Sequence, residues 1–117
     1  MKKDHKEFLK RINKFVENIL DLVKKLPKNI INVPIIKQLI DAGTSVGANY
    51  HEACEAESSK DFVHKIRITI KELKETKYWL RLLYIHNKVF NKEIALIGKE
   101  SNELLKIFST ICKKFKK

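Results

Sequence analysis

Apolar residues recur at alternating steps of four and three along nearly the whole chain, a spacing that permits little other than long amphipathic helices. The series occupy residues 8–26, 36–53, 62–83 and 94–115. Only 3 Gly and 2 Pro interrupt the 117 residues, whereas an all-β chain needs a turn about every ten residues. The sequence therefore predicts one all-α domain over residues 1–117, with four helices of about 22 to 28 residues each.

Three short breaks separate the four series. Pro27 ends the first helix, and Pro34 fits the first turn of the second, where no amide hydrogen is needed. Ser58 begins a capping-box sequence ahead of the third helix, and Asn91 is expected to cap the fourth. Because connections this short join antiparallel neighbours, the predicted fold is an antiparallel up-down-up-down four-helix bundle.

The middle of the second predicted helix, residues 42–48, consists of small residues that include Gly43 and Gly47. Each glycine inside a helix costs ~1 kcal/mol relative to alanine. Close backbone approach of a neighbouring helix is expected to compensate, so this segment is predicted to be tightly packed.

Basic residues outnumber acidic ones by 25 to 14, and the formal net charge is +11. This balance favours a polyanionic partner such as nucleic acid, although abundant lysine can also reflect genome base composition. The densest apolar run, residues 30–36, is far shorter than the ~20 residues that span a membrane. The charged first residues lack the pattern of a secretory signal, so a cytoplasmic location without membrane insertion is expected.

The basic residues of the third and fourth helices form stripes. Those of the third helix lie opposite its core series, and those of the fourth recur every seven residues. A stripe of cations can follow a phosphate backbone, although an ordinary solvated helix face gives the same pattern. The candidate nucleic-acid-binding residues are Lys60, Arg67, Lys71, Lys74, Arg81, Lys92, Lys99, Lys106 and Lys113.

A second stripe on the third helix mixes large apolar groups with two acids. Ile68, Trp79 and Leu82 lie beside the core series, and such a composition is typical of a subunit interface; an extended edge of the core is the alternative. A buried or half-buried polar network that sets helix register or subunit contacts is also expected, with ordinary surface acids as the alternative. Its predicted members are Asn49, Glu52, Glu72 and Glu75.

Few residues in the sequence belong to motifs that support catalysis or metal binding. Cys54 and Cys112 stand far apart without a Cys-x-x-Cys pair, so both are expected to be buried free thiols. The chain has none of the Glu-x-x-His pairs of di-iron bundles, no Gly-rich phosphate loop and no nucleophile elbow. The sequence therefore predicts a non-enzymatic protein without a metal or another cofactor.

Residues 44–53, 57–62 and 71–83 carry a family resemblance. Their Ser-x-x-x-Asn-x-x-Glu and Glu-x-x-Glu-Thr-x-Tyr-Trp-Leu patterns are similar, in order and spacing, to those of bacterial four-helix bundle proteins. These proteins were first noticed as products of intervening sequences in 23S ribosomal RNA genes. The family's typical glycine after the first motif's glutamate is Ala53 here, which is a small change.

The resemblance implies a ring-shaped homopentamer of four-helix bundles. Distantly similar accessory proteins of diversity-generating retroelements are basic rings that engage nucleic acid and a reverse transcriptase, and the resemblance implies partners of these kinds. Together with the basic stripes, it predicts an oligomeric bundle that binds RNA or DNA through phosphates with little sequence specificity. A protein-binding scaffold or accessory protein with incidental charge is the alternative.

Overall fold

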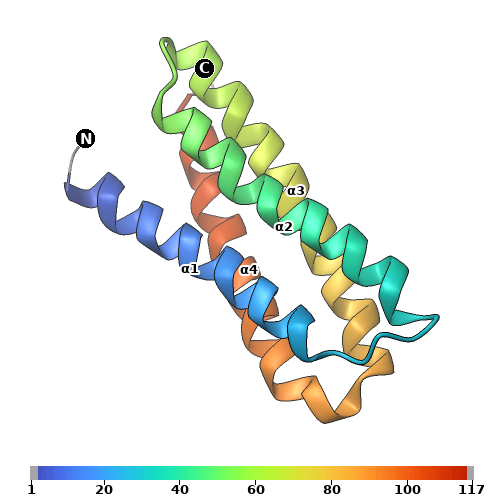
Figure 1. Cartoon of the computed structure of the whole chain (residues 1–117). Helices are drawn as coiled ribbons and strands as arrows, with labels where there is room; N and C mark the ends of the chain where they lie inside the picture. Colours follow the sequence, from blue (N-terminus) through green and yellow to red (C-terminus); the bar gives the residue numbers. More distant parts are fainter. Residues whose placement is uncertain (1–2, 116–117) are drawn as a thin grey trace.

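The computed structural model describes residues 3–115, and this part of the chain folds into four α-helices in which successive helices run in opposite directions (Figure 1). A single 3-10 turn precedes the last helix. The bundle measures 45 × 26 × 19 Å along its principal axes. None of the helices within the described residues has the length and hydropathy needed to cross a membrane. The elements are α1 (Lys3–Lys25), α2 (Asn32–Cys54), α3 (Ser59–His86), η1 (Lys88–Phe90) and α4 (Asn91–Lys113).

The four apolar series of the sequence form the core of the bundle. Each helix contributes fully buried side chains, among them Phe15 of α1, Leu39 of α2, Leu73 of α3 and Leu104 of α4. The helices contain 23 to 28 residues. The all-α prediction, the number of helices in the described chain and their lengths are therefore confirmed.

The helix starts agree with the sequence at two positions and differ at a third. Ser58 caps α3, because its hydroxyl oxygen accepts a hydrogen bond from the Asp61 amide at 3.1 Å. Pro34 lies in the first turn of α2, as predicted. The prediction that Asn91 caps α4 is wrong, because η1 leads directly into the helix. Asn91 is already helical, with φ −54° and ψ −44°.

The small residues of α2 lie against α1. A Cβ atom on Gly43 would lie 2.8 Å from Cδ1 of Ile19, and one on Gly47 would lie 3.1 Å from Cγ2 of Val16. A side chain at Gly43 would therefore overlap a core isoleucine, so the close approach compensates for the low helix propensity of glycine. The predicted tight packing is confirmed at these two glycines, where the contacting atoms belong to side chains of α1 rather than to its backbone.

The closed end of the bundle, formed by residues 26–33 and 83–90, is held by two buried asparagines. Asn32 Nδ2 donates to Asn87 Oδ1 at 2.8 Å, and Asn87 Nδ2 donates to Asn32 Oδ1 at 3.0 Å. The same amide groups also donate to the carbonyls of Pro27 and Leu83, each at 2.9 Å. This reciprocal pair satisfies its polar groups internally and ties the start of α2 to the junction of α3 and α4.

Candidate nucleic-acid interface

A groove of about 400 Å³ lies between α3 and α4. One wall presents Lys77, Arg81 and Tyr84, and the opposite wall presents Lys99 and Asn102. The groove is open at Gly98, where an added Cβ atom would meet no other atom within 4 Å. The complete lining, called the basic groove below, is Lys77, Leu80, Arg81, Tyr84, Ile94, Ala95, Gly98, Lys99 and Asn102.

One residue of each predicted basic stripe lines this groove. Arg81 and Lys99 line it from opposite helices. Because α3 and α4 are antiparallel (Figure 1) and both stripes repeat every seven residues, this register sets Lys74 level with Lys106 and Arg67 level with Lys113. Each level is about 10.5 Å from the next along the helix axis. Of these six residues, only Arg81 and Lys99 line the groove, and Lys106 borders a separate depression with Ile107, Thr110, Ile111 and Lys114.

The other three predicted basic residues lie elsewhere. Lys60 is in the first turn of α3 and Lys92 is in the first turn of α4, so the antiparallel arrangement places them at opposite ends of the bundle. Lys71 lies on the outer surface of α3, beside the row rather than in it. All nine side chains are exposed, so each is accessible to solvent in the single chain.

The acids of α4 are turned toward α1. Glu100 accepts two hydrogen bonds from the Arg11 guanidinium, at 2.8 Å from Nε and 2.7 Å from Nη2, and the bond to Glu100 raises the pKa of Arg11. Glu103 lies 3.7 Å from the same Nη2. Glu93 pairs with Lys25 of α1 at 2.9 Å. The carboxylates that would neutralise the lysines of α4 are therefore occupied on the opposite side of the helix.

The acids in the middle of α3 also lie away from the groove. Lys65 and Glu72 share one face of α3 at a spacing of seven residues, and Lys65 Nζ bonds Glu52 of α2 at 2.7 Å. This face therefore borders α2 rather than α4. Burial, together with the neighbouring Glu75 carboxylate, raises the pKa of Glu72. Within residues 3–115, no carboxylate lies within 4.0 Å of the charged nitrogens of the groove.

The predicted polar residues contact separate partners in the single chain. Asn49 Nδ2 donates to the carbonyl and the hydroxyl of Ser45, at 2.9 and 3.0 Å. Glu52 binds Lys65, whereas Glu72 lies beside Glu75. No hydrogen bond within the described chain joins the two residues of α2 to the two of α3. A network that includes all four remains a prediction for an assembled protein.

The predicted interface residues occupy the α2-facing side of α3. Ile68, Trp79 and Leu82 are each half-buried. Trp79 packs against the core cluster, and its ring lies edge-on to Tyr78 with the ring centroids 4.9 Å apart. Trp79 thus extends the edge of the core. The half-buried stripe still presents apolar surface to solvent, which leaves its role in subunit contacts a prediction.

Three groove residues were not identified from the sequence. Lys77, Tyr84 and Asn102 lie outside the heptad rows of basic residues, although Lys77 and Tyr84 flank Arg81 at helical spacings of four and three. That spacing is the signal that could have found them. The register of α3 against α4, which places Asn102 opposite them, is set by packing in three dimensions.

The two cysteines are free, as expected. They are half-buried, however, so the expectation that both are buried is wrong. Cys54 comes at the last turn of α2 and Cys112 near the end of α4, where the core gives way to solvent. Across residues 3–115, no three His, Cys, Asp or Glu side chains gather closely enough to share a metal ion.

Comparison with known proteins identifies the family. Residues 4–110 match the family model described as 23S rRNA-intervening sequence protein. A similar solved structure is that of a protein of unknown function from the S23 ribosomal protein family of Bacteroides thetaiotaomicron. It is 33% identical, with a TM-score of 0.66 and coverage of 93% of this chain and 94% of the other. The comparison with curated proteins gives no match. The chain belongs to the 23S rRNA-intervening sequence protein family.

Proposed function

We propose that this protein binds RNA or DNA through the basic groove. The supporting observation is that Lys77, Arg81 and Lys99 line one groove whose lining contains no carboxylate. Cations without nearby counter charges attract a polyanion, and the counterions released from the phosphates supply free energy of binding. The function proposed is therefore nucleic-acid binding without catalysis.

The shape of the groove favours a single strand. Packed helices lie only about 8–10 Å apart, so the depression between them admits one phosphate backbone rather than a whole duplex. Tyr84, which is 43% exposed, offers a ring on which an unpaired base can stack. Because phosphate contacts and stacking tolerate any sequence, little base specificity is expected.

Assembly as a ring-shaped homopentamer is part of the proposal. The half-buried stripe of Ile68, Trp79 and Leu82 lies on the α2 side of α3, so contacts made there would leave the basic groove open. Five copies would multiply weak phosphate contacts through their high effective concentration. Light scattering tests the assembly, since Trp79→Ala should reduce the measured mass by removing a large interface aromatic.

A protein-binding role is the second candidate function. Ile30 and Val89 at the closed end are 89% and 91% exposed, and exposed apolar groups of this kind occur at protein interfaces. A reverse transcriptase is one such partner implied by the family resemblance. Under this alternative, nucleic acid would bind weakly or not at all, and the positive charge would be incidental.

The deciding experiment measures fluorescence anisotropy of mixed-sequence RNA, single-stranded DNA and duplex DNA at several salt concentrations. The triple variant Lys77→Gln, Arg81→Gln, Lys99→Gln should bind single strands more weakly. For this variant, the slope of log affinity against log salt concentration should become less steep by about 0.7 for each phosphate that it no longer neutralises. Lys14→Gln, Lys24→Gln and Lys37→Gln together form a control with the same loss of charge at exposed positions on α1 and α2.

A second variant tests the groove without changing charge. Gly98→Leu should fill it while preserving the fold, because the space around Gly98 is open and leucine favours helix. Weaker binding by Gly98→Leu supports the groove as the site. If the triple variant of the groove and the control triple variant lost affinity equally, the groove would be excluded as the binding site. Absence of binding to all three nucleic acids near physiological salt would favour the protein scaffold.

A further inference from the structure

The open end of the bundle, opposite the closed end, contains a cavity of about 710 Å³. It lies where the first turns of α1 diverge from the other helices (Figure 1), and all four helices contribute to its wall. Aromatic rings end the core here. The rings of Phe8 and Tyr50 meet edge-on with their centroids 5.2 Å apart, and the ring centroids of Phe62 and Phe115 are 5.7 Å apart. These rings border the space without filling it.

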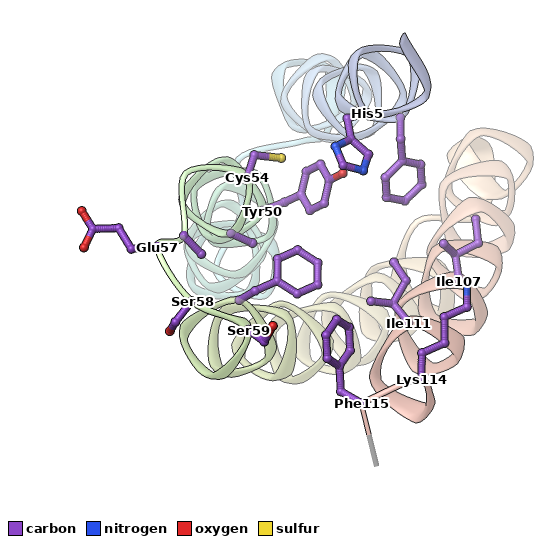
Figure 2. Close-up of a pocket in the computed structure, with 14 residues that line it drawn as sticks. His5, Tyr50, Cys54, Glu57, Ser58, Ser59, Ile107, Ile111, Lys114 and Phe115 are labelled. Carbon is purple, nitrogen blue, oxygen red and sulfur yellow. The ribbon is translucent and has the colours of Figure 1, made fainter. Parts of the chain in front are cut away.

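The charged groups around this cavity are arranged asymmetrically. Figure 2 shows the Glu57 carboxylate pointing away from the cavity, whereas His5 extends into the gap between the helices and Lys114 lies along the α4 wall. The Ser58 hydroxyl is already engaged as the cap of α3. Basic groups therefore accompany a mostly apolar lining, and a ligand with a negative head and an apolar body complements both features.

The size and shape of the cavity select a small molecule. Pockets that hold such ligands commonly have volumes of about 300–1,000 Å³, are mostly apolar and contain a few polar groups that fix orientation. The interior here is built from Phe8, Tyr50, Phe62 and Ile111. An extended alkyl chain can lie along these side chains, whereas a fully charged or strongly polar molecule would lose its hydration without replacement.

We propose that this cavity binds an amphipathic carboxylate of the long-chain fatty-acid class. The alkyl chain lies among Phe8, Phe62 and Ile111, and the carboxylate lies beside Lys114 and His5. This site is separate from the basic groove, so the proposal does not depend on nucleic-acid binding. Each pair of methylene groups added to the ligand should tighten binding about tenfold until the cavity is full.

The test is isothermal titration calorimetry of the whole chain with laurate, myristate and palmitate, each below its micelle concentration, and with the alcohols of the same lengths. Affinity should rise with chain length, and each acid should bind more tightly than its alcohol. Ile111→Trp should weaken binding severalfold by narrowing the cavity. Leu96→Trp is the matched control, since Leu96 is on the same helix and is 68% exposed.

The head group is tested by Lys114→Gln, which changes one exposed side chain and leaves the fold intact. It should weaken the binding of the acids severalfold and leave the binding of the alcohols unchanged, whereas Lys37→Gln, at an exposed position of α2, should affect neither. Binding that does not depend on chain length, that is unchanged by Ile111→Trp or that is equal for acids and alcohols would overturn the proposal. It would also be overturned if no acid bound. A change in the mass of Ile111→Trp in light scattering would then show that a second copy occupies the cavity.

Discussion

The closed and open ends of the bundle are built from the same four helices but are completed by different forces. At the closed end, Asn32 and Asn87 exchange directional hydrogen bonds, and Lys28 donates to the carbonyls of Val23, in the last turn of α1, and Leu26, just after it. At the open end, aromatic rings meet around a cavity. Hydrogen bonds specify the distance between elements, whereas apolar burial specifies only that surfaces be covered. The spacing of the helices is therefore fixed more strictly at the closed end.

The largest expected effect comes from breaking the amide pair. Asn87→Ala should lower the free energy of unfolding by about 2 kcal/mol, because it leaves the buried Asn32 Oδ1 without its donor. The urea unfolding midpoint measures this loss. Asn102→Ala, at an exposed position of α4, should change the stability by less than about 0.5 kcal/mol. Equal effects at the two positions would show that the pair does not hold the closed end.

An intermediate effect is expected at the open end in alkaline solution. Burial, together with the Cys54 thiol, raises the pKa of Tyr50 well above its usual value of 10.0. The unfolded chain then releases this proton first, so stability falls as the pH rises above 10.0, by at most about 1.4 kcal/mol per pH unit. Tyr50→Phe should remove this part of the decline in urea unfolding curves measured across that range. Identical declines in both proteins would contradict the expectation.

The smallest expected effect concerns an ion pair near the closed end. Lys25 and Glu93 are 2.9 Å apart, but their side chains are 56% and 33% exposed. Lys25→Gln should therefore cost no more than about 0.5 kcal/mol, and the cost should vanish at high salt. Thermal unfolding at low and high salt measures it. A loss as large as that of Asn87→Ala would mean that charge, rather than the amide pair, closes this end.

The periodic part of the fold was predictable from the sequence, because it depends on neighbours within one helix. Leu39 and Leu73 follow the core spacing, and the Ser58 cap requires only three residues of local chain. The capping role predicted for Asn91 was wrong because η1 takes up the turn before it and Asn91 is already helical. The Asn32–Asn87 pair joins residues 55 positions apart, so no local pattern contains it.

The candidate site was predictable only as separate stripes. The spacing of seven residues identifies the rows that contain Arg81 and Lys99, since each row belongs to a single helix. Which row faces which, and at what stagger, depends on how α3 and α4 pack. Lys77 and Tyr84 enter the groove as a result of that packing. The same limit explains why the aromatic residues of the open end were not recognised as the wall of a cavity.

Through Arg11 and Lys25, α1 supplies the positive charges that neutralise the acids of α4. Arg11 and Lys25 bind Glu93, Glu100 and Glu103, and none of these five residues touches the basic groove. If α1 separated from α4, three negative charges would become uncompensated one helix diameter from the lysines, and the positive potential of the groove would fall. The docking of α1 therefore adjusts the electrostatic potential of a surface that α1 does not form.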